Sequence, residues 1–344
     1  MNLLSSVESR GLRALMGLPD PVLRRLAGKP VVLDGQTLAP DLQLLLRLQR
    51  LLRKRGMEVA ELEQGRRDLR DSAVLVGGDQ PIGAVRQLEV AGLPARHYLP
   101  RAASGSGAGP LLLFFHGGGF VYGDLDSHDA PCRLLAERSG VPVLSVEYGV
   151  GPERAFPGAF DDAEAALGWV LAHADDLGVD PARIAVGGDS AGGQISAWVA
   201  IAAARAGIPL AWQLLFYPAT HATRDTESLR LFAEDFYLTA EYIAWVTELY
   251  LPTAADRDDE RMQLVSVEVP DGLAPAYVVT AGFDPLRDEG EQYARHLEAA
   301  GVAVELRRCP TQVHGFLNMA GVVRSSRADV LVAADRLGEV LGKG

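Results

Sequence analysis

The stretch RIAVGGDSAGGQ, residues 183–194, combines a short apolar run, four glycines and the start of a helical pattern. Glycine adopts backbone conformations that other residues avoid, so this stretch predicts a tight turn between a strand and a helix. Such turns serve two purposes in α/β proteins: they bind phosphate through backbone amides, or they present a reactive serine. The residues in and after the turn decide between these two functions.

The glycine pattern of residues 187–193 does not fit a phosphate-binding loop. A P-loop needs a lysine after its last glycine, whereas this turn continues into Gly193 and Gln194. The dinucleotide fingerprint G-x-G-x-x-G fails as well. A count from Gly187 places Asp189 at the second glycine, where its carboxylate would repel pyrophosphate. We therefore predict no nucleotide site here.

The same residues fit the pattern G-x-S-x-G, with Ser190 at its centre. In a nucleophile elbow of this type, the serine lies on a strained turn and its hydroxyl is exposed at the carboxyl edge of a sheet. The N-terminus of the following helix favours the negative charge that develops during attack. We predict that Ser190 is a catalytic nucleophile.

A second glycine turn, FFHGGGF at residues 114–120, also follows an apolar run. Acyl transfer passes through a tetrahedral oxyanion that must be held by fixed N–H donors. In serine hydrolases with the G-x-S-x-G elbow, these donors come from such a glycine turn and from the residue after the nucleophile. We predict an oxyanion hole formed by the N–H groups of Gly117, Gly118 and Ala191.

A serine nucleophile needs a general base, and the base needs an orienting acid. In this type of site the chain order is serine, acid, histidine. His314, in the loop after the last predicted strand, is the expected base, whereas His296 falls within a helical pattern. The preceding strand is followed by Asp284, Asp288 and Glu289. We favour Asp284 because it comes first after the strand, and the other two fit the first turn of a helix.

Apolar runs alternate with helical patterns along most of the chain, which predicts an α/β fold with a mostly parallel sheet flanked by helices. The first two runs are separated by a short turn typical of a hairpin. The eight predicted strands are residues 85–90, 95–100, 111–116, 141–148, 183–188, 212–218, 276–282 and 302–309.

The gap between the sixth and seventh runs is longer than one crossover helix requires. We interpret residues 219–260, rich in aromatic side chains, as an insertion that forms a helical cap together with an N-terminal segment, residues 1–75. Residues 76–344 then form the catalytic domain. Core packing is the alternative role for each of the candidate substrate-binding residues in the insertion, which are Phe236, Tyr237, Leu238 and Trp245.

The N-terminal segment contains DLQLLLRLQRLLRKRG, residues 41–56, which predicts a basic amphipathic helix. Its expected apolar face consists of Leu44, Leu45, Leu48, Leu51 and Leu52. Such a helix either lies on a membrane surface or packs over an acidic body. The apolar face lacks the tryptophan that is common at membrane interfaces, which favours packing.

Composition excludes several classes of function. A formal net charge of −12 argues against nucleic acid as a partner. No apolar run approaches ~18 residues, so we predict no stable membrane insertion. The first residues lack the apolar segment of a signal peptide, which predicts a cytoplasmic protein. The two cysteines, Cys132 and Cys309, lack the spacing of a zinc site and are expected to be small buried residues; we predict no metal.

Several motifs in register give the chain a resemblance to the hormone-sensitive-lipase-like family of α/β-hydrolase carboxylesterases, which includes many bacterial enzymes. The resemblance covers residues 88–320. It implies the α/β-hydrolase fold, a cap that shapes the acyl pocket, and no cofactor. The motifs are HGGGFVYGDLDSHD, EYGVGPERAFPGAFDDA, GGDSAGG, FYLT, DPLRDEG and HGF, in that order.

The resemblance also implies a function: hydrolysis of small-molecule carboxylic esters with short to medium acyl chains, through an acyl-enzyme intermediate. Members of the family are often dimers, so a homodimer is compatible with the sequence. An amidase or peptidase with the same three residues is an alternative. It differs from an esterase in how the leaving amine is protonated, and the sequence does not show this difference. A non-catalytic receptor is a second alternative, and the presence of His314 argues against it.

Overall fold

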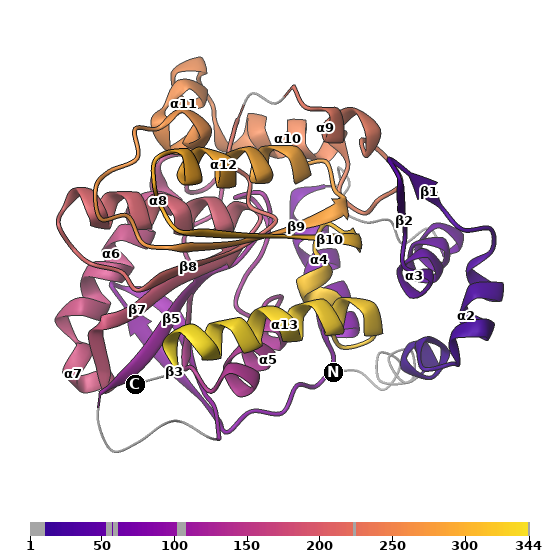
Figure 1. Ribbon diagram of the computed structural model, residues 1–344, viewed down its shortest axis with the longest axis horizontal. Helices are drawn as coiled ribbons and strands as arrows, with labels where there is room; N and C mark the ends of the chain where they lie inside the picture. Colours follow the sequence, from indigo (N-terminus) through magenta and orange to yellow (C-terminus); the bar gives the residue numbers. More distant parts are fainter. Residues whose placement is uncertain (1–10, 53–56, 58–60, 102–107, 223–224, 343–344) are drawn as a thin grey trace.

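The computed structural model describes residues 11–52, 57, 61–101, 108–222 and 225–342 of the 344-residue chain. An eight-stranded sheet forms its centre (Figure 1). All eight predicted strands are confirmed, with differences at their ends. The strands are β3 (Ala84–Val90), β4 (Leu93–Leu99), β5 (Gly109–Phe115), β6 (Val143–Val146), β7 (Val179–Asp189), β8 (Trp212–Phe216), β9 (Ala276–Phe283) and β10 (Val304–Val313).

The strand order across the sheet is β10-β9-β8-β7-β5-β6-β4-β3. Strand β4 pairs antiparallel with β3 and with β6, and every other neighbouring pair is parallel. The hairpin turn between β3 and β4 consists of Ala91 and Gly92, both with positive φ, as in the two-residue turns that match the twist of paired strands. The sheet is therefore mostly parallel, as the sequence predicts.

Helices cover both faces of the sheet (Figure 1). Successive side chains of a strand point to opposite faces, so a strand covered on both faces is apolar throughout. In β5, Leu111, Leu113 and Phe115 share a core with α8, whereas Leu112 and Phe114 pack on the side of α5 and α13. The helices of the two layers are α6 (Gly158–Ala172), α7 (Ala174–Leu177), α8 (Ala191–Arg205) and α12 (Arg287–Ala299) on one side, and α5 (Asp129–Ser139) and α13 (Arg324–Leu341) on the other.

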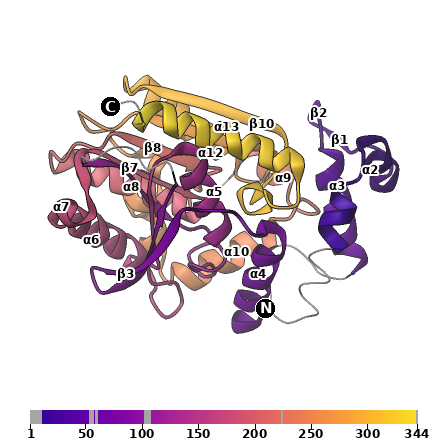
Figure 2. The same ribbon diagram turned by 90° about the horizontal axis from the view of Figure 1, so that it is seen from below.

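Apart from helix α4 (Leu62–Gly77), the described N-terminal segment lies at one end of the molecule, beside the carboxyl ends of β9 and β10, whereas α4 lies against α5 (Figures 1 and 2). Several polar contacts attach it there. Among them, Ala39 N donates to Thr311 O at 3.0 Å, Asp34 pairs with Arg287 at 2.7 Å, and Ser325 N donates to Asp41 Oδ2 at 2.9 Å. The other elements of this segment are α2 (Asp20–Ala27), β1 (Val32–Leu33), β2 (Gln36–Thr37) and α3 (Pro40–Leu51).

Helix α3 buries a different face from the one predicted. Leu44 and Leu45 are buried, but Leu51 and Leu52 are 70% and 66% exposed. Gln43 is also buried, and its amide donates to the carbonyl oxygens of Ala27 and Lys29 at the end of α2. The first turns of α3 pack against α2 and the body of the protein, whereas its last turn extends beyond them.

The segment between β8 and β9 contains several helices joined by loops. Met57 N donates to Tyr237 O at 2.9 Å, so the N-terminal segment contacts the inserted one.

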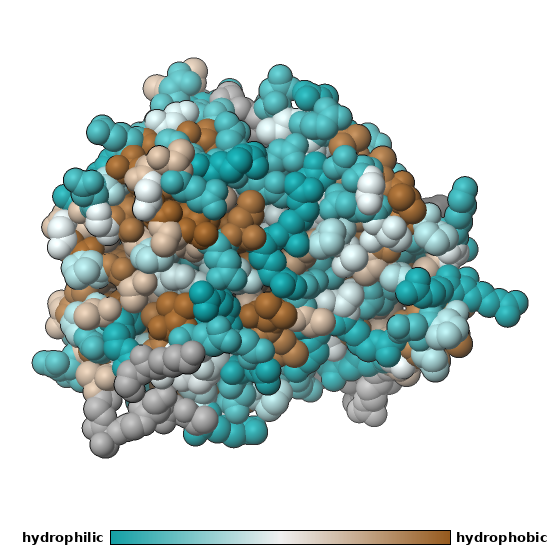
Figure 3. Space-filling model, in the orientation of Figure 1, coloured by the Kyte–Doolittle hydropathy of each residue, from teal (hydrophilic) through white to brown (hydrophobic). Residues whose placement is uncertain are grey.

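None of the helices among the described residues is long and apolar enough to cross a bilayer. On the face shown in Figure 3, apolar patches are interspersed among hydrophilic residues. The helices after β8 are α9 (Glu227–Leu231), α10 (Ala240–Tyr250), α11 (Ala254–Asp258), η1 (Glu260–Met262) and η2 (Leu264–Ser266); η3 (Phe316–Met319) follows β10.

Candidate active site

Ser190 occupies a strained turn between β7 and α8. Its φ of +56° lies in a region that residues other than glycine rarely adopt. The two flanking glycines are required by close approach, because a Cβ on either Gly188 or Gly192 would collide with the carbonyl oxygen of Phe115. The glycines of the G-x-S-x-G pattern thus let the turn pack against β5.

Ser190, His314 and Asp284 form a chain of hydrogen bonds. Ser190 Oγ lies 3.0 Å from His314 Nε2, and His314 Nδ1 lies 2.8 Å from Asp284 Oδ2. A carboxylate only accepts hydrogen bonds, so this geometry assigns the imidazole proton to Nδ1 and leaves Nε2 as an acceptor for the serine hydroxyl. All three residues are buried; Ser190, at 7%, is the most exposed.

The sheet brings the histidine and the carboxylate together. Asp284 follows β9 and His314 follows β10, and these parallel neighbours end at the same edge. The ring of Tyr217, which follows β8, lies 4.6 Å from the His314 ring and packs against it. His296 lies in α12, with its Nε2 atom 2.7 Å from Val267 O, so it has no part in this cluster.

The two alternative acids have other partners. Asp288 accepts hydrogen bonds from Ser228 N and from Arg287 Nε, each at 2.8 Å. Glu289 accepts one from Thr220 N at 2.8 Å. Both lie in the first turn of α12, where acidic residues are favoured.

The glycine turn after β5 differs from the prediction at its first residue. Gly117 N donates to Asp189 Oδ1 at 2.9 Å, so this amide is already occupied. In contrast, the N–H groups of Gly118, Gly119 and Ala191 find no acceptor among the described residues. Gly119 and Ala191 line the cavity beside Ser190. Within the described residues, the N–H group of Gly119 is therefore without an acceptor beside Ser190, whereas that of Gly117 is not.

Asp189, next to Ser190 in the chain, is a buried partner of this turn. Besides Gly117 N, its carboxylate lies 3.2 Å from His128 Nε2 and 3.5 Å from Tyr217 Oη. Burial alone would raise the pKa of Asp189, but nearby His128 and the bond from Gly117 outweigh it and lower the pKa. The sequence alone did not identify His128 as the partner of Asp189. The available signal was that Asp189 is an acid at the end of a buried strand, because a buried acid requires a partner.

His116 holds the turn with its own side chain. Its Nδ1 atom lies 2.9 Å from Gly117 O, and because a carbonyl only accepts, Nδ1 carries the proton. Tyr148 Oη donates to His116 O at 2.6 Å, and the two rings stack at 4.3 Å. Burial, reinforced by His128, lowers the pKa of His116 to about 4, so the ring is neutral at neutral pH.

Two buried histidines should make the fold sensitive to mild acid. Burial lowers the pKa of both His116 and His97 to about 4, whereas imidazole in an unfolded chain titrates near ~6.5. Below that value the unfolded chain binds two protons that the folded chain does not bind until about pH 4. We expect the free energy of unfolding to fall by about 2–4 kcal/mol between pH 7 and pH 5, measured by urea titration. His97→Leu should roughly halve this loss. A free energy of unfolding that stays constant between pH 7 and pH 5 would contradict the lowered pKa values of the two histidines.

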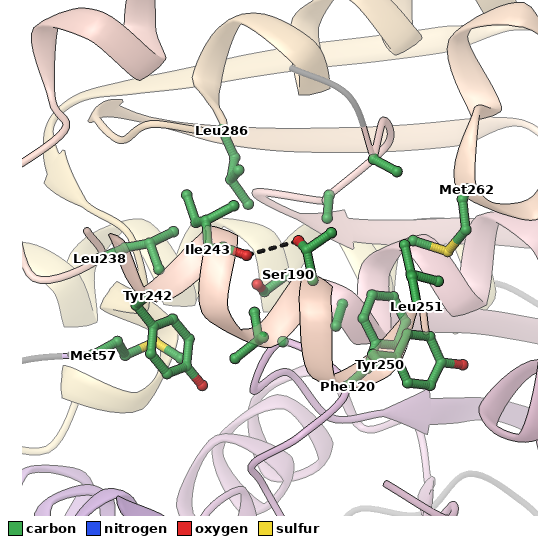
Figure 4. Close-up of a pocket in the computed structure, with 16 residues that line it drawn as sticks. Met57, Phe120, Ser190, Leu238, Tyr242, Ile243, Tyr250, Leu251, Met262 and Leu286 are labelled. Carbon is green, nitrogen blue, oxygen red and sulfur yellow. Dashed lines mark hydrogen bonds between the residues drawn. The ribbon is translucent and has the colours of Figure 1, made fainter. Parts of the chain in front are cut away.

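An apolar cavity adjoins Ser190 (Figure 4). Its volume is small, about 40 Å³. In Figure 4, Ser190 lies between two groups of side chains. The labelled lining residues are Met57, Leu238, Tyr242 and Ile243 in one group, Phe120, Tyr250, Leu251 and Met262 in the other, and Leu286 above Ser190.

Only one of the four predicted substrate-binding residues lines this cavity. Leu238 does. Phe236 instead packs in the core shared with the N-terminal segment, and Tyr237 packs on the turn after β10. Trp245 packs against the rings of Tyr122 and Tyr242, at 5.8 Å and 5.9 Å, and does not line the cavity. The cavity is therefore lined by residues of α10 that neighbour the predicted ones. Packing decides which side chains of α10 face the cavity, and the aromatic composition of the segment does not reveal this.

No group of three or more His, Cys, Asp or Glu side chains within the described ranges could hold a metal ion. Cys132 and Cys309 are buried free thiols, which confirms the prediction of their burial. Burial raises the pKa of both thiols, so neither is activated as a nucleophile.

A serine at a strand-to-helix elbow, with a carboxylate and a histidine after two later strands at the same sheet edge, is the arrangement of the α/β-hydrolase class. Residues 112–318 match a family described as "alpha/beta hydrolase fold". The chain belongs to this family, in its hormone-sensitive-lipase-like branch.

Named relatives cover most of the chain. It is 43% identical to the carboxylic ester hydrolase LipN of Mycobacterium tuberculosis, over 91% of this chain and 86% of LipN. It is 36% identical to an ethyl acetate hydrolase of Pseudomonas putida, over 88% of this chain and 98% of the relative. Among solved structures, an esterase of Pyrobaculum calidifontis superposes with a TM-score of 0.81 at 34% identity, covering 88% of this chain and 98% of the esterase.

Proposed function

We propose that this protein is a serine carboxylesterase that hydrolyses small-molecule carboxylic esters. The observation that carries the proposal is the continuous chain of hydrogen bonds from Ser190 through His314 to Asp284, beside an apolar cavity. The names of its relatives, which include carboxylic ester hydrolases and an ethyl acetate hydrolase, support an ester rather than another acyl substrate.

In the proposed mechanism, His314 Nε2 takes the proton of the Ser190 hydroxyl as Oγ attacks the acyl carbon. The tetrahedral intermediate collapses, and His314 gives this proton to the departing alcohol, which leaves an acyl-enzyme. Water then attacks the acyl carbon, His314 takes its proton, and the proton returns to Ser190 Oγ as the acid departs. Asp284 holds the imidazole and stabilises its positive charge in both steps.

We assign the oxyanion hole to the N–H groups of Gly118, Gly119 and Ala191. Their lack of other acceptors among the described residues supports this assignment, since a free N–H can donate to the developing charge. The adjoining N-terminus of α8 adds a favourable dipole for negative charge.

We propose that residues 1–75 and 219–260 together cap residues 76–344 and shape the acyl pocket. The hydrogen bond from Met57 N to Tyr237 O supports a joint role, as does the presence of Met57, Leu238 and Tyr242 around one cavity. The limited room in that cavity favours short acyl chains over long ones.

A chain-length series should therefore show a sharp optimum. With 4-nitrophenyl esters, we expect kcat/KM to be highest for acyl chains of about two to six carbons and to fall at least tenfold by ten carbons, because each added methylene needs apolar room. Anilides of the same acids serve as the comparison. Faster turnover of anilides than of esters would favour the amidase alternative, and a maximum at long chains would contradict the proposed pocket.

We also propose a cytoplasmic homodimer. The two buried free thiols are compatible with a reducing compartment. Strand β10 lies at an edge of the described sheet, and the part of this edge before Thr311, where Ala39 N binds, can pair with a second copy. Light scattering of the purified protein tests the dimer, and a monomer would reject it. Cell fractionation tests the location, and a protein recovered outside the cytoplasm would reject the cytoplasmic one.

A further inference from the structure

The turn His116–Gly119 is held through the carbonyl oxygens of its peptides. Gly117 O accepts from His116 Nδ1 at 2.9 Å. Gly118 O accepts from Tyr122 N at 2.9 Å and from the hydroxyl of Tyr242 at 3.2 Å. The first two donors belong to the turn and the residues just after it, whereas Tyr242 comes from α10, in the segment between β8 and β9.

Holding a carbonyl also orients an amide. In a trans peptide the C=O and N–H bonds are fixed in one plane and point in opposite directions. The bond from Tyr242 to Gly118 O therefore restricts the direction of the Gly119 N–H, which belongs to the same peptide. Gly119 lines the cavity beside Ser190 and finds no acceptor for its N–H among the described residues.

We propose that Tyr242 is a positioning residue for the oxyanion hole, an inference that rests on the proposed ester hydrolysis. Its hydroxyl orients the peptide that supplies the Gly119 N–H, while its ring lines the substrate cavity. One side chain of the inserted segment thus connects the pocket wall to the oxyanion donors. Burial, with contributions from neighbouring tyrosines, keeps the pKa of Tyr242 well above its usual value, so it remains a donor at any working pH.

The size of the effect follows from the strength of one neutral hydrogen bond. Such a bond contributes a net factor of about 3–10 to an equilibrium. Donation to Gly118 O also polarises the peptide and strengthens its N–H as a donor, because hydrogen bonds in a chain reinforce one another. The effect should be moderate, since Tyr122 N still holds the same carbonyl, and it should concern the transition state more than the bound ester.

The test is Tyr242→Phe, which removes the hydroxyl and keeps the ring against the cavity. We expect kcat for 4-nitrophenyl butyrate to fall about 3- to 10-fold while KM changes less than twofold. The affinity for a trifluoromethyl ketone, which forms a tetrahedral adduct with the nucleophile, should fall by the same factor as kcat. Active-site titration with a fluorophosphonate corrects each rate for the fraction of active protein.

Tyr293→Phe is the matched control. Tyr293 in α12 is fully buried and its hydroxyl has no hydrogen-bond partner within the described residues, but it lies outside the cavity lining. Its replacement also removes one buried hydroxyl, and we expect kcat to stay within about 1.5-fold of the parent.

Three results would overturn the role of Tyr242: an unchanged kcat, a raised KM at constant kcat, or a loss of kcat without a matching loss of affinity for the ketone. The second would make Tyr242 a substrate contact only, and the third would point to a general disturbance of the site. Failure of the proposed function is distinguishable from these results, because the parent protein itself would then neither hydrolyse esters nor react with the fluorophosphonate.

Discussion

Ser190→Ala is expected to lower kcat by about 10⁶, to the level that the remaining site supplies without a nucleophile. The variant keeps the hydrogen-bond donors of the turn and the apolar cavity, so ester should still bind with a similar KM. The variant should also fail to react with a fluorophosphonate, which forms its bond with the nucleophilic oxygen. Steady-state kinetics and mass spectrometry of the labelled protein measure the two effects.

Ser196→Ala provides the control for this change. Ser196 lies in the same helix, α8, and among the residues that the structure describes its hydroxyl bonds only to Gly192 O, one turn earlier. A serine that bonds back along its own helix contributes little to stability, so alanine should be tolerated there. Ser190→Ala with more than a hundredth of the parent kcat would rule out Ser190 as the nucleophile.

The regular part of the fold could be predicted because its signals are local. The strand β7 and the helix α8 on either side of Ser190 follow from one apolar run, two pairs of glycines and the pattern after them. The hairpin of β3 and β4 follows in the same way from Gly92 and its neighbours. Asp284 and His314 were predictable because parallel strands end at one edge, which turns chain order into proximity.

The details of the glycine turn were not predictable in the same way. Which of its amides is free depends on Asp189, a residue 72 positions away that accepts from Gly117 N. Asp189 in turn is paired with His128, whose surroundings in the sequence resemble an ordinary helix start. Three consecutive glycines predict a donor site, but the bond from Gly117 N to Asp189 leaves only the N–H groups of Gly118 and Gly119 without an acceptor in the described part of the turn.

The sequence also could not predict which faces of helices α10 and α3 are buried. In α10, tyrosine, isoleucine, tryptophan and valine follow one another closely, so several faces are apolar and periodicity selects none of them. The rings of both Tyr242 and Trp245 contact Tyr122, but of these two α10 residues only Tyr242 lines the cavity. In α3 the leucine pattern continues to Leu52. The body of the protein does not extend far enough to cover the end of this pattern, so Leu51 and Leu52 are exposed.

Asp284→Asn tests the third member of the site, and we expect it to lower kcat by about 10⁴. The structure fixes how the new amide would lie. Asp284 Oδ1 accepts from Leu286 N at 2.8 Å, so the amide oxygen takes this place and its NH₂ group faces His314 Nδ1. An NH₂ donor requires Nδ1 to be an acceptor, which moves the imidazole proton to Nε2. His314 then cannot accept the proton of Ser190, although every heavy atom keeps its place.

Asp288→Asn separates this explanation from the rival acid. Asp288 lies four residues later and bonds to Ser228 N and Arg287 Nε, so its replacement should affect stability and leave kcat within a few-fold of the parent. Fluorophosphonate labelling adds a second readout, because Asp284→Asn should slow the reaction of Ser190 by a factor similar to the loss in kcat. If Asp288→Asn instead caused the larger loss, the acid would be misassigned. If Asp284→Asn lost less than tenfold, the imidazole would not depend on Asp284 for its tautomer, since a wrong tautomer removes the general base from almost every molecule.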